Sequence, residues 1–110
     1  MPHLRFRAVS VDILQQISTP LLADLCALTG GKPEFVTLEC IDSIQVRNGE
    51  REASFPFVEL VWFERPQEVQ DAAAALITRH LKAVLGEQTY VVVQVLPIVK
   101  SAYYSNGQHY

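Results

Sequence analysis

The sequence predicts an α+β fold in which two βαβ units form one four-stranded mixed sheet with two helices on one face. The order strand, helix, strand occurs twice along the chain, and each helical pattern ends at a glycine. The strand residues also divide by parity into an apolar face and a mixed face. The chain has 110 residues, the usual length of one domain. We therefore expect a single domain over 1–110, with βαβ units at 1–46 and 57–97 and a C-terminal tail at 98–110.

The first unit begins with a strand over His3–Ala8, where polar and apolar residues alternate. Ser10 is a typical N-cap for the helix that follows. Apolar residues then recur at helical spacing, namely Ile13, Leu14, Ile17, Leu21, Leu25 and Leu28. The Gly-Gly pair at 30–31 should end this helix. Phe35–Ile44 is rich in β-forming residues and predicts the second strand.

The second unit repeats this plan. Phe57–Phe63 predicts a strand, and Pro66 suits the first turn of a helix. The apolar stripe of that helix consists of Val69, Ala72, Ala73, Leu76, Ile77, Leu81 and Val84. Gly86 should end the helix, and Tyr90–Leu96 predicts the fourth strand.

Two Asn-Gly pairs predict tight turns outside these units. One is Asn48-Gly49, between the two units, and the other is Asn106-Gly107, in the polar and tyrosine-rich tail. The tyrosines favour a tail that docks on a neighbouring subunit over one that is mobile.

The two faces of the predicted sheet differ in composition. One face is wholly apolar and should lie under the helices: Leu4, Phe6, Ala8, Val36, Leu38, Cys40, Val58, Leu60, Trp62, Val91, Val93 and Val95. The other mixes charged and large apolar residues: Arg5, Arg7, Phe35, Thr37, Glu39, Phe57, Glu59, Val61, Phe63, Tyr90, Val92, Gln94 and Leu96. Two helices cover only one face, so the second would expose an apolar patch. The simplest way to remove this patch from water is to bury it against another subunit.

The charge and hydropathy of the chain exclude several classes of partner. Its formal net charge is -3, whereas nucleic-acid-binding proteins usually carry a basic patch, so no nucleic acid is expected. No apolar run reaches the ~18 residues of a membrane span, and the N-terminus lacks the apolar region of a signal peptide. We therefore expect no membrane association and a cytoplasmic location.

The residues that commonly hold metals are scattered. Cys26 and Cys40 form no CxxC motif, and His3, His80 and His109 have no ligand at metal-binding spacing. The cysteines are interpreted as small buried apolar residues. Neither a metal nor a cofactor is expected.

Several segments together resemble the tautomerase superfamily. They are the start Met1-Pro2, the segment Leu28–Phe35 with its Thr-Gly-Gly-Lys-Pro sequence, the strand Phe57–Phe63 and the tail segment Tyr103–Gly107. The resemblance covers nearly the whole chain. The chain resembles the branches that are like macrophage migration inhibitory factor (MIF) and 4-oxalocrotonate tautomerase. It most resembles an uncharacterised bacterial branch of the superfamily. It implies a MIF-like fold, a homotrimer and an isomerase site at the subunit boundary.

The resemblance also implies that the N-terminal proline, Pro2, is the catalytic residue. Its amine is free only once Met1 is removed, which a small second residue favours. A secondary amine is intrinsically basic, so a useful general base needs apolar burial or a nearby cation to lower its pKa. The amine could then move a proton on a small keto or enol acid without a cofactor. The alternative is that a proline follows Met1 by chance.

Four further residues are candidate substrate-binding residues. Lys32 matches a lysine of the family's Thr-Gly-Lys-Pro segment and could hold a carboxylate or polarise a carbonyl, or it is a solvated loop lysine. Tyr90 matches a pocket tyrosine donated by the neighbouring subunit, or it packs in the trimer interior. Arg65 precedes a helix N-terminus, where anions are favoured, or it is a surface arginine. Phe63 lies beside it and could serve only in packing.

The sequence departs from the family at two points. Val92 stands where the MIF-like branch has a pocket asparagine, and no arginine pair matches the one that binds a dicarboxylate in the 4-oxalocrotonate tautomerase-like branch. Arg5 and Arg7 could instead pair with Glu39 and Glu59 across the sheet.

Three functions therefore compete. The first is a cofactor-free tautomerase, and the second is a non-catalytic trimer with this fold that acts in binding. The third is a ferredoxin-like βαββαβ module, which has the same element order but does not need Pro2.

Overall fold

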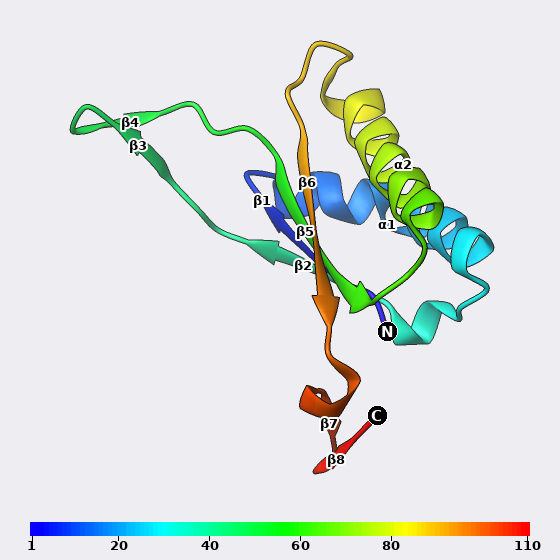
Figure 1. Ribbon diagram of the computed structural model, residues 1–110. Coiled ribbons are helices and arrows are strands. Elements are labelled where there is room, and N and C mark those ends of the chain that lie inside the picture. Colours follow the sequence, from blue (N-terminus) through cyan, green and yellow to red (C-terminus); the bar gives the residue numbers. More distant parts are fainter.

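The computed structural model describes residues 1–110 and has two long helices packed on one four-stranded sheet (Figure 1). The sheet strands are β1 (His3–Arg7), β2 (Thr37–Ile41), β5 (Phe57–Phe63) and β6 (Val92–Ile98). The helices are α1 (Val11–Thr29) and α2 (Gln67–Leu85). The other elements are two short 3-10 helices, η1 (Pro33–Phe35) and η2 (Lys100–Ala102), and two hairpins, β3 (Gln45–Arg47) with β4 (Glu50–Glu52) and β7 (Tyr104–Ser105) with β8 (Gln108–His109). The predicted α+β fold with a mixed sheet is confirmed.

The strand order of the main sheet is β2-β1-β5-β6. β1 pairs parallel with β2, and β5 pairs parallel with β6, while β1 and β5 are antiparallel. The two strands of each βαβ unit are therefore direct neighbours. A ferredoxin-like fold is instead built from split βαβ units. The ferredoxin-like alternative is accordingly wrong.

The hydrophobic core lies between the sheet and the helices. Its buried residues are Leu4, Phe6, Val9, Leu14, Ile17, Leu21, Leu25, Val58, Leu60, Trp62, Ala73, Ile77 and Leu81. The core residues that lie on strands come from the sheet face predicted to be apolar. Five further residues of that face are partly buried and pack against the core: Val36, Leu38, Val91, Val93 and Val95. Burial of this apolar surface is the main force that holds the helices on the sheet.

Two members of the predicted apolar face do not join the core. Ala8 lies just beyond β1 with a φ of 60°, so the strand ends before it. Cys40 is exposed, and its thiol donates a hydrogen bond to the carbonyl of Val9 at 3.1 Å. Cys26 is half-buried. The prediction that both cysteines are buried is therefore wrong.

The second predicted strand is divided in the structure. Phe35 belongs to η1, the paired strand β2 covers Thr37–Ile41, and residues 42–44 lead into the β3–β4 hairpin. This hairpin extends away from the sheet and the helices (Figure 1). β-Propensity alone cannot locate the point at which a chain leaves its sheet. Similarly, β6 begins at Val92, so Tyr90 precedes the strand.

Both predicted Asn-Gly turns are present. Asn48 and Gly49 have φ values of 52° and 77°, and Asn106 and Gly107 have values of 52° and 82°. Two consecutive positive φ angles are typical of the type I′ turn, whose twist suits a two-residue hairpin loop. The first turn joins β3 to β4, and the second joins β7 to β8 in the tail.

The helix starts follow the predicted capping residues. Ser10 caps α1, accepting a hydrogen bond from the Ile13 amide on its side-chain oxygen at 3.2 Å. Pro66 was expected in the first turn of α2 but is its N-cap residue, with φ -54° and ψ 149°, so the helix starts at Gln67. The structure contains no helix that is both long and apolar enough to cross a membrane.

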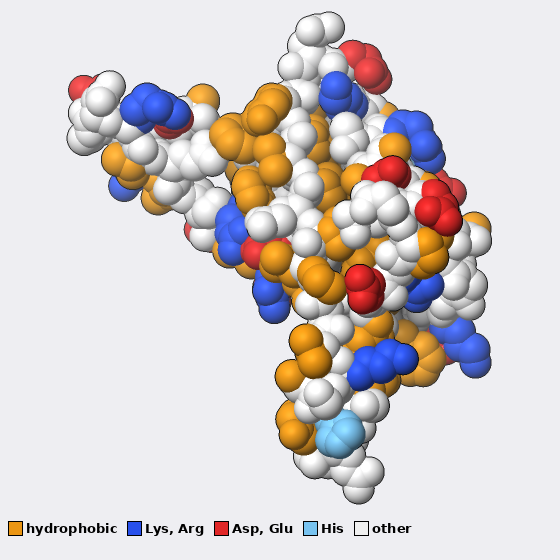
Figure 2. Space-filling model, viewed as in Figure 1, with side chains coloured by type: hydrophobic (Ala, Val, Ile, Leu, Met, Phe, Trp, Pro, Cys, Tyr) orange, Lys and Arg blue, Asp and Glu red, His pale blue; other side chains and the backbone are white.

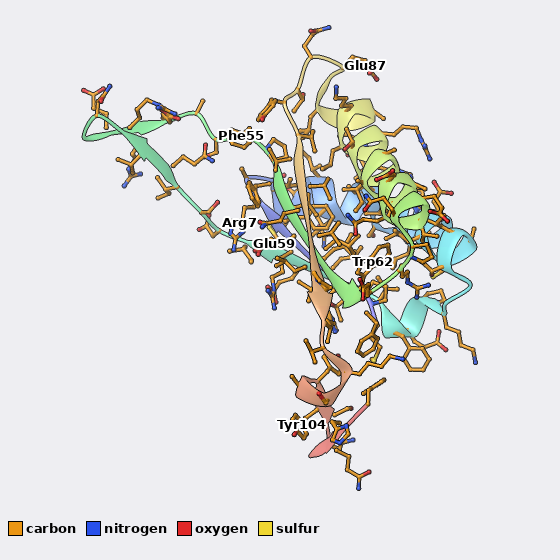
Figure 3. The ribbon with its side chains drawn as sticks, in the orientation of Figure 1. Arg7, Phe55, Glu59, Trp62, Glu87 and Tyr104 are labelled. Atoms are coloured by element: carbon orange, nitrogen blue, oxygen red, sulfur yellow. The ribbon has the colours of Figure 1, made fainter.

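The face of the sheet opposite the helices remains uncovered within one chain. Arg7 forms an ion pair with Glu59 there, and the Arg5 Nε lies 3.9 Å from a Glu39 oxygen, so both predicted cross-strand pairs are present. Figure 3 shows Arg7 and Glu59 side by side on neighbouring strands. Figure 2 shows hydrophobic side chains over β5 and β6 next to charged ones. The predicted contrast between the two faces is thus present.

Candidate functional site

The N-terminus lines a cavity at the end of the sheet where β1 begins and β5 finishes. The cavity has a volume of about 350 Å³, within the size range of small-molecule sites. Its lining residues are Met1, Pro2, Thr29, Gly31, Lys32, Phe35, Val36, Arg65 and Tyr110. Both ends of the chain lie at this end of the molecule (Figure 1). Pro2, Lys32 and Arg65, three of the residues singled out from the sequence, meet here.

Backbone pairing fixes the position of Pro2. The Thr37 amide donates a hydrogen bond to the Pro2 carbonyl at 3.0 Å, which extends the pairing of β1 with β2 by one residue. Pro2 is buried and lines the cavity. Residue 2 is therefore held rigidly at the wall of the cavity.

The loop after α1 brings Lys32 to the same cavity. Gly30 adopts a left-handed conformation with a φ of 74° and donates a hydrogen bond to the Cys26 carbonyl, which ends the helix. The Thr29 hydroxyl then accepts a hydrogen bond from the Gly31 amide at 3.2 Å. Lys32 follows at the start of η1 and is exposed, so its ammonium group is free to meet a ligand that enters the cavity.

Arg65 reaches the cavity from the connection between β5 and α2. Its guanidinium carbon lies 5.4 Å from the centroid of the Trp62 ring, and Trp62 is buried in the core. The stacked ring restricts the arginine and adds a cation–π attraction. Together with Lys32, Arg65 gives the cavity two positive charges, which favour an anionic ligand.

The same surroundings change the acidity of the terminal amine. Burial lowers the pKa of the Met1 amine below its ordinary value of 8.0, and the nearby positive charge of Arg65 lowers it further. Both causes disfavour the ammonium form. The Met1 amine is therefore neutral more often than an exposed terminal amine, and the neutral form is the one that a general base needs.

The C-terminal tail closes one side of the cavity. The ring of Tyr110 packs against Phe63 and Tyr103 with centroid distances of 5.2 Å to each, and its hydroxyl lies 2.8 Å from the Met1 sulfur. Phe63 does not line the cavity; it supports Tyr110 from behind. The tail was expected to dock on a neighbouring subunit, but within this structure it packs against the N-terminus of its own chain.

Tyr90 lies apart from this site. It precedes β6, and the register places the start of β6 beside Phe57 and Arg7, at the end of β1 opposite to Pro2. Its ring is exposed and packs edge-on against Phe55 with a centroid distance of 5.0 Å. Within one chain the structure therefore does not bring Tyr90 to the cavity.

Sequence reasoning missed several residues of the site. Phe35 and Val36 were assigned to a strand, and Tyr103 and Tyr110 were not assigned a role in the site. The tyrosines follow a turn signal, but only the three-dimensional structure shows that the folded-back tail reaches the N-terminus. The structure contains no group of three or more His, Cys, Asp or Glu side chains placed to hold a metal ion.

Comparisons with known proteins agree on the family and on the fold. The family model described as "Domain of unknown function (DUF1904)" matches residues 1–109. A solved protein of unknown function from Vibrio cholerae O1 biovar eltor str. N16961 is 36% identical, with a TM-score of 0.89 over 99% of this chain and 87% of that chain. No curated protein matches the sequence.

More distant structures share the fold. A fused 4-OT, described as an asymmetric trimer, has a TM-score of 0.80 at 16% identity, over 97% of this chain and 94% of that one. The MIF-like protein of Entamoeba histolytica has a TM-score of 0.72 at 10% identity, over 99% and 98% of the two chains. These neighbours confirm the predicted tautomerase-like, MIF-like fold. The chain belongs to the DUF1904 family and has the fold of the tautomerase superfamily.

Proposed function

We propose that the chain without Met1 is a cofactor-free tautomerase in which the Pro2 amine is the general base for a small keto or enol acid. The observation that carries the proposal is the position of the N-terminus in a cavity that also contains Lys32 and Arg65. This arrangement offers a base and two cations at one place. The fold shared with 4-OT and MIF-like proteins supports the proposal.

The chemistry needs only the groups that line the cavity. Lys32 and Arg65 bind the carboxylate of the acid by charge and hydrogen bonding. The neutral Pro2 amine removes a proton from the carbon beside the carbonyl, and the electron pair of the C–H bond moves toward the carbonyl oxygen. The resulting ammonium returns the proton to that oxygen. The net change is keto to enol, and the enzyme ends in its starting state.

The test is mass spectrometry of the purified protein before and after treatment with pyruvate and borohydride at pH 7. Loss of Met1 and a single reduced adduct on Pro2 are expected, because a neutral secondary amine condenses with a keto acid and the product is then reduced. Lys32→Gln should raise the pyruvate concentration that gives half-maximal modification of Pro2, because the carboxylate loses a cation. Lys82→Gln, on helix α2, is the matched control and should leave this concentration unchanged. An intact Met1, or a Pro2 that stays unmodified, would remove the proposed base.

The second part of the proposal concerns assembly as a homotrimer. The uncovered sheet face contains half-buried Phe57, Val61 and Leu96, which a partner subunit would remove from water. The fused 4-OT relative in fold is described as a trimer. In such an assembly a neighbouring copy could place its Tyr90 at the cavity, which one chain alone does not do.

Sedimentation velocity tests the assembly. Val61→Glu places a charge in the middle of the open face and should shift a trimer toward monomer. Val99→Glu is the control, because Val99 is 66% exposed and lies beyond the end of β6. A wild-type protein that sediments as a monomer would contradict this part. A trimer whose Pro2 cannot be modified would favour the alternative function, a non-catalytic trimer that acts in binding.

A further inference from the structure

Three side chains form a hydrogen-bonded line next to the N-terminus. The Thr37 hydroxyl lies 2.7 Å from Nδ1 of His3, and Nε2 of His3 lies 2.7 Å from the Tyr103 hydroxyl. The rings of His3 and Tyr103 are also stacked, with centroids 5.8 Å apart and planes inclined by 22°. The line begins on β2, crosses β1 and ends on the segment between η2 and β7. Nothing in the proposed function uses it.

The far end of this line points toward the N-terminal residue. The Tyr103 hydroxyl lies 4.0 Å from the Met1 sulfur, and the Tyr110 hydroxyl lies 2.8 Å from the same atom. Met1 and Tyr110 both line the cavity, and the Met1 sulfur lies beside both hydroxyls. Removal of Met1 would open the space beside them. The Tyr103 hydroxyl would then border the space that the Met1 side chain leaves.

A neutral histidine in this line is compatible with two directions of hydrogen bonding. A neutral histidine has one N–H, so it donates through one nitrogen and accepts through the other. If the Thr37 hydroxyl donates to Nδ1, the Nε2–H donates to the oxygen of Tyr103. The Tyr103 O–H is then free to donate to a further acceptor. In this direction each group donates to the next, and the Tyr103 O–H is the last donor. In the opposite direction the Tyr103 O–H donates to Nε2 and Nδ1–H donates to the Thr37 oxygen, so a donor role for Tyr103 requires the first direction.

We propose that the Tyr103 hydroxyl, positioned by His3, is a hydrogen-bond donor to the carbonyl oxygen of the ligand at the Pro2 amine. The inference rests on the proposed function. When Pro2 removes a proton from the carbon beside the carbonyl, or adds to the carbonyl, negative charge develops on that oxygen. A donor already aimed at the oxygen stabilises this charge more than the ground state. Tyr103 is thus a catalytic residue, and His3 is a positioning residue.

The surroundings of His3 favour the neutral ring that this arrangement needs. Burial lowers the pKa of His3 below 6.5, and the terminal amine and Arg5 lower it further, while Glu39 on β2 raises it. Arg5 lies on β1 and is exposed, and β5 presents Val61 opposite His3. Near pH 7 the ring therefore carries one proton, as the donor line requires.

The experiment measures the rate at which pyruvate and cyanoborohydride modify Pro2, by mass spectrometry. Tyr103→Phe should slow the modification at least about 10-fold, because one positioned donor at a developing oxyanion is typically worth 10²–10³ in rate. The matched control is Tyr104→Phe, since Tyr104 is 63% exposed in the tail hairpin (Figure 3) and makes neither contact. His3→Leu should slow the reaction similarly, and His3→Gln should restore part of the rate, because the glutamine amide supplies an N–H donor.

A second measurement is independent of the reaction. Nitrogen-15 NMR of His3 should show the Nε2–H tautomer, and Tyr103→Phe should change its signals. An Nδ1–H tautomer at pH 7, or equal rates for Tyr103→Phe and Tyr104→Phe in folded proteins, would overturn the inference. These outcomes differ from failure of the proposed function, in which Pro2 of the wild type stays unmodified.

Discussion

The guanidinium of Arg65 stacks over the indole of Trp62, with 5.4 Å from its carbon to the ring centroid. This contact places a fixed cation beside the terminal amine, because Trp62 is itself locked in the core. A flexible surface arginine would spread its charge over many positions. Arg65 therefore lines the cavity with a side chain whose position is restricted by the stacked indole.

Replacing this arginine should raise the pKa of the terminal amine. Arg65→Met removes the positive charge that disfavours the ammonium form, whereas burial still lowers the pKa. At pH 7 the variant amine should be protonated more often and should react more slowly with an amine-directed reagent. Arg65→Lys keeps the charge but loses the planar stack, so its amine should have a pKa between the other two.

The measurement is the pH dependence of terminal-amine acetylation in a form that retains Met1, followed by mass spectrometry. An Arg79→Met variant is the control, because Arg79 lies on α2 and pairs with Asp24. A midpoint that is unchanged in Arg65→Met would show that burial alone sets the acidity of the amine.

Protein stability should fall on the acid side of neutrality because of His3 and the terminal amine. Both groups have folded-state pKa values below their ordinary values of 6.5 and 8.0. The unfolded chain therefore binds more protons in the window between the lowered and the ordinary pKa values. The contribution of these two groups to the free energy of unfolding should be complete above about pH 8. It should decrease as the pH falls through about 6.5.

Urea unfolding at a series of pH values, at one protein concentration, measures this dependence. His3→Gln should reduce the slope between about pH 5.5 and 7, because the titrating ring is gone. His109→Gln should leave the slope unchanged, since His109 is exposed in the tail. A slope that His3→Gln leaves intact would assign the effect to the amine.

Much of the fold follows from local sequence signals. Short segments determine which side chains of a strand share a face, which glycine ends a helix and where the two Asn-Gly turns lie. These features were predicted. The division of Phe35–Ile44 was not, because Ile44 has the same β-propensity whether it continues a strand of the sheet or leads into a separate hairpin. The exposed position of Cys40 has a similar cause: side-chain chemistry alone does not show that β2 is an edge strand of the sheet.

The candidate site divides in the same way. Pro2, Lys32 and Arg65 could be named because charge and position along the chain distinguish them. Tyr110 and Tyr103 could not, since their role depends on a tail that folds back over about a hundred residues of sequence to meet Met1 and His3. Contacts of this kind have no periodicity and no motif.

The contact between the two helices gives a further prediction. Nε2 of His80 on α2 lies 2.7 Å from a carboxylate oxygen of Asp24 on α1. The histidine side chain is only 16% exposed and the aspartate side chain is 43% exposed, so the bond is partly shielded from water. Asp24→Asn should lower the free energy of unfolding by about 1 kcal/mol, the usual net value of one hydrogen bond.

The comparison variant for this bond is Arg79→Gln. Arg79 approaches the same carboxylate at 3.6 Å, but its side chain is 66% exposed. An exposed ion pair contributes about 0–1 kcal/mol, so this change should have the smaller effect in urea unfolding. Equal losses in the free energy of unfolding for the two variants would show that the hydrogen bond of His80 adds nothing beyond the exposed ion pair of Arg79.

The last prediction concerns the glycine that ends α1 and starts the loop with Lys32. Gly30 has a φ of 74°, a conformation that costs an L-residue with a Cβ atom roughly 1–2 kcal/mol. Gly30→Ala should therefore lower the free energy of unfolding by about that amount, although no atom lies within 4 Å of the added methyl group.

Gly31 is the matched control, because it lies in the same loop without a positive φ. A Cβ there would lie 3.2 Å from the Thr29 hydroxyl, which can shift slightly, so Gly31→Ala should be the milder change. Because the strain in Gly30→Ala falls on the loop, it should also weaken the binding of an anion such as pyruvate through Lys32. Paired urea unfolding and pyruvate titrations on both variants measure the two effects. A Gly30→Ala protein as stable as Gly31→Ala would show that the helix stop does not depend on the left-handed conformation.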